Sequence, residues 1–244
     1  MKNIRNLFFT LFLVLCPFVT SQAVDLPKQG FGIQIGWAQP ILRLNAPGNI
    51  AMKDSLTRNI HLNGFKAGLV YDASYAAGFG SSMGINYTFG VSNSGWTSDN
   101  AYGMPYPRSR QMITYQELEV FVDWQYKFEI AKETYLMLTT GPTIQCGLAM
   151  KMRSDKQMFE GQDYDPKYFD GYTNEDPDQL FQRINVTWGV GAGFQYKRYF
   201  LRGGYDFGLI VPYKNTDFVN GEYHTRGRLD QWSIKLGVYL WYTD

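Results

Sequence analysis

Seven charged side chains lie in separate segments where polar and apolar residues alternate. Their residue types could do chemistry if the fold brought them together. They are Lys66, Glu117, Glu119, Asp123, Arg202, Asp206 and Lys235. Carboxylates and amines that share an interior can form ion pairs, or they can pass ions or protons along a path. Because isolated charges in a narrow interior are costly, we expect these seven to pair as a structural polar core. A gated ion or proton path through the same groups is the alternative.

The stretch 152–182 is dense in acids, prolines and tyrosines. It holds the acids Asp155, Glu160, Asp163, Asp165, Asp170, Glu175, Asp176 and Asp178, and the bases Arg153, Lys156 and Lys167. Clustered carboxylates could bind calcium, which prefers several oxygen ligands. The Asp-x-Asp-x-Asp-Gly core of a calcium loop is missing, so we expect a solvated surface loop without a metal. Its tyrosines, Tyr164, Tyr168 and Tyr172, would suit an adhesive surface.

Nucleophilic catalysis needs a nucleophile and a base within hydrogen-bond reach. Only His61 and His224 could act as imidazole bases, and neither stands in a Ser/His/acid signature. A dyad with Ser55 or Thr225 has no support in the sequence. No phosphate loop, zinc spacing or redox pair is present in the sequence. We therefore expect neither an enzyme nor a cofactor.

The seven charges lie in segments with a two-residue period, which is the period of a β-strand. The predicted strands include residues 30–45, 60–71, 82–91, 117–126, 136–150, 184–196, 199–211 and 233–242. The connections between them alternate between long and short. The long ones are 47–59, 93–111, 152–182 and 212–229, and the short ones are 72–78, 129–133 and 197–198. Pro40 predicts a bulge or bend in the first strand.

The chemistry of the two strand faces decides what surrounds the sheet. In 82–91 and 184–196 one face is large and apolar, while the other is glycine and small uncharged residues. A soluble barrel would collect Lys, Glu and Arg on its water-exposed face, whereas small residues suit the inside of a narrow barrel. Aromatic residues gather toward the short connections, as in a membrane-interface girdle. These are Tyr71, Trp124, Tyr126, Tyr135, Tyr196, Tyr199, Trp241 and Tyr242. The apolar faces should therefore meet lipid, and the first and last strands should pair to leave no open edge.

The first 23 residues have a basic start, an apolar run and the small-x-small site Ser21-Gln22-Ala23. We expect residues 1–23 to be a cleaved signal peptide and residues 24–244 to form one domain. Lipidation at Cys16 is the alternative, although the residues before it are too bulky for a typical lipobox. Without Lys2 and Arg5 the chain has 21 Lys and Arg against 22 Asp and Glu, which predicts no attraction to nucleic acid. Cys146 is then the only cysteine, so no intramolecular disulfide is possible.

With the strands placed, the chain resembles the outer-membrane β-barrel domain family, often called porin-like. The barrels of OmpA and OmpX are similar in architecture. The resemblance rests on the run from Ile184 to Phe194 and on the closing segment Leu236-Gly-Val-Tyr-Leu-Trp-Tyr. It implies an all-β, eight-stranded antiparallel up-and-down transmembrane β-barrel in the outer membrane, in contact with outer-membrane lipid. Members commonly end on an aromatic residue that the barrel-assembly machinery recognises, whereas here Thr243-Asp244 follow Tyr242.

The family has no shared catalytic motif, so no functional residue is transferred from it. We expect a small, monomeric outer-membrane protein with a structural or surface-interaction role, whose long outer loops contact an extracellular ligand. A narrow solute or ion channel is the main alternative. An outer-membrane lipid-modifying enzyme is the third.

Overall fold

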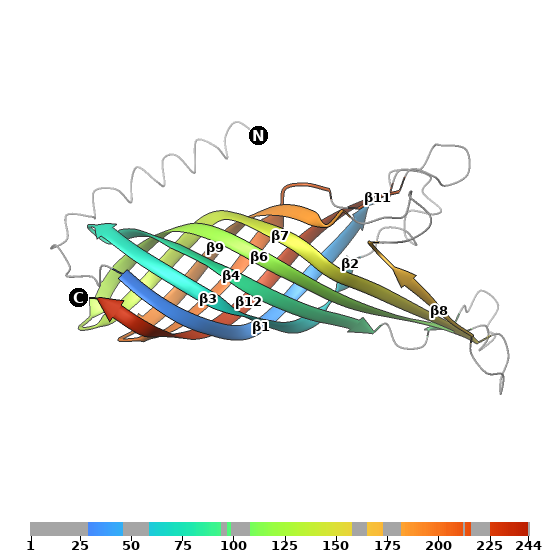
Figure 1. Ribbon diagram of the computed structural model, residues 1–244, viewed down its shortest axis with the longest axis horizontal. Helices are drawn as coiled ribbons and strands as arrows, with labels where there is room; N and C mark the ends of the chain where they lie inside the picture. The colour runs from blue at the N-terminus through green and yellow to red at the C-terminus, as the bar shows by residue number, and fades with distance from the viewer. Residues whose placement is uncertain are drawn as a thin grey trace.

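The computed structural model describes residues 29–45, 59–93, 97–98, 108–157, 165–172, 182–211, 213–215 and 225–243. Within these ranges, eight long strands form a closed and tilted ring (Figure 1). They are β1 (Gln29–Asn45), β3 (Asn63–Ala76), β4 (Phe79–Asn93), β6 (Arg108–Ala131), β7 (Thr134–Gln157), β9 (Ile184–Tyr196), β10 (Tyr199–Gly208) and β12 (Thr225–Thr243). Each strand is antiparallel to the next, and β1 pairs with β12 to close the ring. The predicted eight-stranded antiparallel barrel and its closure are confirmed.

The two ends of the barrel differ. At one end, tight turns join the strands at Ala77-Gly78, Lys132-Glu133 and Lys197-Arg198. Ala77 and Gly78 both have positive φ, of 49° and 86°, as the two central residues of a type I′ hairpin turn require. At the other end lie four short strands, β2 (Asn59–His61), β5 (Thr97–Ser98), β8 (Asp165–Asp170) and β11 (Tyr213–Asn215). They extend the sheet beside β1, β6, β7 and β12 respectively.

Several predicted loops are partly strand, so their predicted boundaries are wrong. β6 begins at Arg108, β7 ends at Gln157 and β12 begins at Thr225. The hairpin partners Arg108 and Gln157 face each other at the far end of the β6–β7 ladder. Backbone hydrogen bonds continue such a ladder whether or not the side chains alternate, so pairing extends beyond the apolar pattern. Figure 1 shows β6, β7 and β8 projecting past the other strands at the right.

Pro40 does not bulge β1, which is a second correction. The pairing of β1 with β12 stays in register through Pro40, opposite Gln231. The interruption is on the opposite edge of β1, where β2 and β3 pair with it. There Leu62 separates β2 from β3, and the Leu62 amide donates to the Pro40 carbonyl at 2.9 Å. Proline has no N–H for the ladder, and the neighbouring strand breaks where that donor is missing.

The wall carries its large apolar side chains on the outside and its polar side chains on the inside. Ile35, Leu69, Val120 and Leu236 are exposed on the outer face, while Gln34, Glu119 and Gln195 are buried within. No helix among the described residues has the length and hydropathy to cross a membrane. The inverted distribution of polarity agrees with an outer face that meets lipid.

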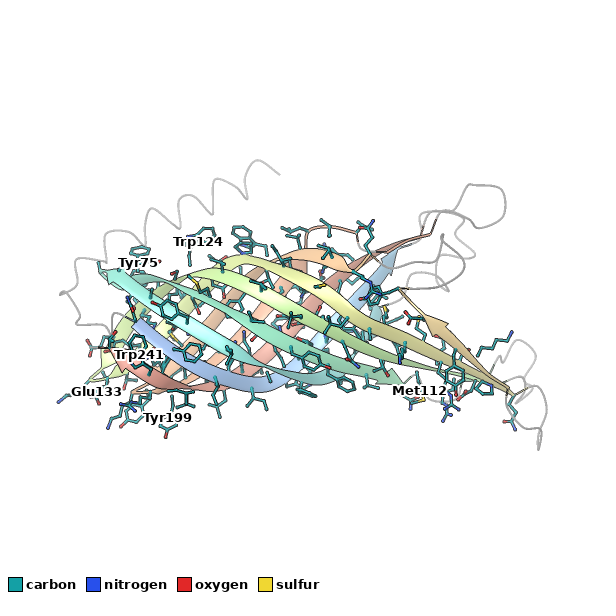
Figure 2. The ribbon with its side chains drawn as sticks, in the orientation of Figure 1. Tyr75, Met112, Trp124, Glu133, Tyr199 and Trp241 are labelled. Atoms are coloured by element: carbon teal, nitrogen blue, oxygen red, sulfur yellow. The ribbon has the colours of Figure 1, made fainter. Side chains whose placement is uncertain are left out.

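The predicted aromatic girdle needs two corrections. Tyr199 and Trp241 are exposed at the tight-turn end, as Figure 2 shows, and Trp124 also points outward. Tyr135 is instead buried, and Tyr242 packs against an interior cluster. A register shift between Phe31 and Gly32 pairs them with Trp241 and Tyr239, so Leu240 has no partner. Such a bulge reverses the alternation, which turns Trp241 outward and Tyr242 inward.

Candidate functional site

The middle of the barrel interior holds a buried carboxylate pair and one lysine. Lys66 Nζ lies 2.7 Å from Glu119 Oε2, and both side chains are almost fully buried. Thr88 donates to the other oxygen of Glu119 at 2.9 Å. Glu117 accepts hydrogen bonds of 2.6 Å from Tyr115 and from the Gln231 amide. Three of the seven predicted charges therefore share one hydrogen-bonded layer that draws on four strands, β3, β4, β6 and β12.

A second polar layer lies nearer the tight turns and is centred on Asp72. Its carboxylate is 2.6 Å from Arg202 Nη2 and 3.3 Å from Lys127 Nζ, and it accepts a hydrogen bond from the Tyr239 hydroxyl. Arg202 also donates to Ser82 at 2.8 Å. Of these charges, only Arg202 is among the seven predicted ones. Asp72 and Lys127 continue the inward alternation of their strands by one more step, so extending each predicted strand would have found them.

The remaining three predicted charges are not brought into direct contact. Asp123, Asp206 and Lys235 are half-buried, and none of their side chains makes a hydrogen bond or ion pair with another described residue. Both carboxylates lie within electrostatic range of Lys235. A Cβ at Gly189 would lie 2.5 Å from Asp206 Oδ1, so the glycine leaves the room that this carboxylate occupies.

Two apolar clusters pack among the polar layers, and Tyr239 belongs both to one cluster and to the layer around Asp72. The outer one contains Leu42, Leu62, Ile113, Tyr115, Met150 and Leu229, and Tyr172 packs against it. The cluster near the tight turns contains Val70, Phe121, Met137, Phe200 and Tyr239. A cavity of about 20 Å³ remains in the outer cluster, which is room for about one water molecule. The polar groups are therefore enclosed by packed side chains.

Glycines on the inner face give these aromatic rings their space. A Cβ at Gly237 would lie 2.1 Å from the Phe200 ring, and a Cβ at Gly147 would lie 1.8 Å from the Tyr172 hydroxyl. Any side chain at either position would displace the ring above it. Small residues on the inner face therefore make room for a packed interior.

The projecting part of the β6–β7 hairpin is held by an ion-paired carboxylate on its outer side. Asp155 lies 2.6 Å from Arg110 Nη2 and 2.7 Å from Arg153 Nε, and the Arg153 guanidinium stands 5.7 Å from the Tyr168 ring. Burial alone would raise the pKa of Asp155, but the hydrogen bonds from Arg110 and Arg153 outweigh it and lower the pKa below its ordinary value.

Only part of the acidic stretch 152–182 is described. Asp155 belongs to β7 and Asp165 opens β8, while Asp170 accepts a hydrogen bond from the Tyr172 amide at 2.9 Å. Glu160, Asp163, Glu175, Asp176 and Asp178 lie outside the described residues. Over the part of the chain that is described, no three His, Cys, Asp or Glu side chains gather where they could hold a metal ion.

The residues considered for catalysis are not assembled into a site by the described structure. His61 is exposed at the end of β2, and its side chain makes no hydrogen bond or ion pair with another described residue. Ser55 and His224 lie outside the described residues, as does the expected signal peptide at 1–23. Thr225 is the first residue of β12.

Solved structures of outer-membrane barrels are similar to this chain at low identity. Ail, the attachment invasion locus protein of Yersinia pestis, in complex with the heparin analogue sucrose octasulfate, is 11% identical. The match covers 86% of this chain and 98% of that chain, with a TM-score of 0.39. Neisserial surface protein A is 12% identical over 90% of this chain and 100% of that chain, with a TM-score of 0.36. A search of curated proteins gave no match.

A family model decides the assignment. The model described as the outer membrane protein beta-barrel domain matches residues 31–211, which is most of the chain and includes seven of the eight long strands described above. The closed ring and the apolar outer face agree with that match. The protein is therefore an outer-membrane protein, and the chain belongs to the outer membrane protein beta-barrel domain family.

Proposed function

We propose that this protein is a non-conducting outer-membrane anchor that presents its projecting β6–β7 hairpin to ligands outside the cell. The observation that carries the proposal is the interior, in which apolar clusters and buried polar side chains pack against each other. An eight-stranded barrel has room for interior side chains and little else. Such a barrel can hold an outer structure in place without conducting solutes.

In this proposal the seven predicted charges serve structure. The contact between Lys66 and Glu119 and the contact between Arg202 and Asp72 join strands that are far apart in the sequence. Asp123, Asp206 and Lys235 complete the polar core through longer-range attraction. Buried ion pairs that join distant strands in this way fix how the walls of the barrel face each other.

The hairpin supports the surface-contact part of the proposal through its length and its bracing. β6 and β7 have 24 residues each, whereas a tilted membrane strand needs about 9–11 residues. Roughly half of each strand therefore stands beyond the lipid. Asp155 and its two arginines brace this part, and Tyr168 of β8 is 71% exposed beside it. An exposed aromatic ring on a braced support is well suited to binding.

Conductance in planar lipid bilayers tests the closed interior. We expect the full-length folded protein to give no reproducible current steps above those of protein-free bilayers. Reproducible steps would favour the narrow channel and would contradict the enclosed interior. Incubation with lipopolysaccharide followed by mass analysis tests the lipid-modifying alternative, for which we expect no change of mass.

Binding to an array of glycans and extracellular-matrix proteins tests the hairpin. The protein in lipid nanodiscs is compared with Tyr168→Ala and with the matched control Tyr75→Ala, since Tyr75 is 70% exposed at the tight-turn end. Figure 2 shows Tyr75 at the opposite end from Met112 of the hairpin. We expect Tyr168→Ala alone to weaken binding. Equal weakening by both variants, or no binding to any array member, would leave only a structural role.

A further inference from the structure

The outer face of the barrel wall is hollowed where β9, β10 and β12 lie side by side. The hollow measures about 890 Å³, and its lining includes Val190, Ala192, Gly203, Tyr205, Trp232 and Ile234. Gly203 sits on the outward face of β10 between Leu201 and Tyr205. A Cβ at Gly203 would have no neighbour closer than 3.8 Å, unlike the crowded glycines inside the barrel. The missing side chain therefore leaves open space in a wall that is otherwise covered by large apolar groups.

One end of the hollow is lined by two arginines that face each other. Arg43 and Arg228 are directly opposed across the seam between β1 and β12. Like charges in this position destabilise a sheet unless an anion lies between them. Asp230 supplies one carboxylate, 2.6 Å from Arg43 Nε and 3.0 Å from Arg228 Nε, and it also accepts a hydrogen bond from Tyr205. Two cations with one anion leave a net charge of one positive on this part of the outer wall.

The guanidinium groups keep donors for a further anion. Arg43 uses Nε on Asp230 and Nη2 on Tyr205, while Arg228 uses Nε and Nη2 on Asp230. The Nη1 groups of both arginines make no hydrogen bond to a described residue. The side chains of Arg43 and Arg228 are 41% and 48% exposed, so a ligand can reach them. Arginine donors of this kind suit phosphate oxygens.

The hollow has the depth of one membrane leaflet. Six residues separate Arg228 from Ile234, which is about 20 Å along a strand. A strand tilted by about 45° then descends roughly 14 Å, close to half of a hydrocarbon core about 30 Å thick. The arginines lie at the end opposite the tight turns, which is the outer side in bacterial barrels. The hollow therefore runs from the outer surface toward the bilayer midplane.

We propose that this hollow is a binding site for a phosphorylated membrane lipid of the outer leaflet. One acyl chain lies along Gly203 and Ala192, and the phosphate binds between Arg43 and Arg228. Charge and position favour a lipid over a second copy of this chain, because the site joins an anion-binding end to an apolar trough in lipid. The inference does not depend on what the projecting hairpin binds.

Native mass spectrometry of the detergent-solubilised full-length protein tests the site with two lipids that differ only in the phosphate. The probes are dioleoyl phosphatidic acid and dioleoylglycerol, and inorganic phosphate serves as a competitor. We expect phosphatidic acid to be retained roughly tenfold better, which corresponds to about 1.4 kcal/mol. Arg228→Gln should remove that preference, because it deletes one cation and leaves Asp230 paired with Arg43. Gly203→Leu should reduce retention of both lipids by filling the trough.

Matched controls separate the site from general effects. Ala67→Leu places the same leucine side chain on the outward face of β3, and Lys197→Gln removes a cation at the tight-turn end; neither should alter retention. Every variant should keep the heat-dependent gel mobility of the folded barrel. Equal retention of the two lipids, or loss with Ala67→Leu as large as with Gly203→Leu, would overturn the proposal. Displacement of the lipid by inorganic phosphate, or a dimer that Gly203→Leu dissociates, would also overturn it.

Discussion

Neutralising Asp72 should destabilise the barrel more than any change to a surface ion pair. Its carboxylate faces two buried cations, with Arg202 at 2.6 Å and Lys127 at 3.3 Å. Asp72→Asn keeps the shape of the side chain and removes the only anion within ion-pair distance of either cation among the described residues. Breaking a buried pair by removing one partner costs about 3–5 kcal/mol, and we expect a loss in that range. Gln195 still accepts from Lys127 at 3.0 Å and Ser82 still accepts from Arg202 at 2.8 Å, so the expected loss is that of the anion and not of every hydrogen-bond partner.

The matched control is the exposed pair at the tight turns. Lys197 and Glu133 are 3.7 Å apart, and both side chains are about half exposed. Glu133→Gln makes the same carboxylate-to-amide change there, and its cost should be about 0–1 kcal/mol. The contrast between the two substitutions isolates the effect of burial from the effect of losing a charge.

Denaturant unfolding in lipid vesicles, followed by tryptophan emission and linear extrapolation, gives the free energies of unfolding. The double variant Asp72→Asn/Arg202→Met removes both charges, so it should cost less than the sum of the single changes. Strict additivity, or a cost for Asp72→Asn no larger than that of Glu133→Gln, would refute the view that this contact is an energetically coupled buried pair.

Two further predictions concern packing and pH. Gly237→Ala should destabilise the barrel by about 1–3 kcal/mol, because the new methyl group overlaps the Phe200 ring. Gly203→Ala on the open outer face should cost far less. The denaturant midpoints of unfolding of the two variants give the comparison. At pH values above the ordinary carboxyl pKa of about 3.9, the contacts that lower the pKa of Asp155 stabilise the projecting hairpin. This contribution is lost as the pH falls through the lowered pKa. Hydrogen exchange of the hairpin amides should show their protection falling over that pH range. Arg110→Gln should move that loss to higher pH, and an unchanged profile would contradict the assignment.

The alternation of residue types was enough to predict the strands, the short turns and the polarity of the two faces. These features are local. Successive side chains leave a strand on opposite sides, and a two-residue turn whose twist matches that of the flanking strands joins neighbouring strands directly. The same parity placed Lys66, Glu119 and Arg202 inside. The alternation gave wrong strand ends where backbone pairing continues beyond the apolar pattern, as at the outer end of β6 and β7. It gave wrong orientations where a bulge at Leu240 reverses the alternation.

The residue pattern alone predicts strands with one lipid-facing side and one charged inner side, because period and face chemistry belong to each strand. Which charges meet depends on the folded barrel, since it follows from the stagger of the strands around the closed ring. Arg202 and Asp72 are 130 residues apart, and Arg43 and Asp230 are 187 apart. The second pair exists only because β1 closes on β12 in one register. That closure also creates the opposed arginines on the outer wall, which no local pattern indicates.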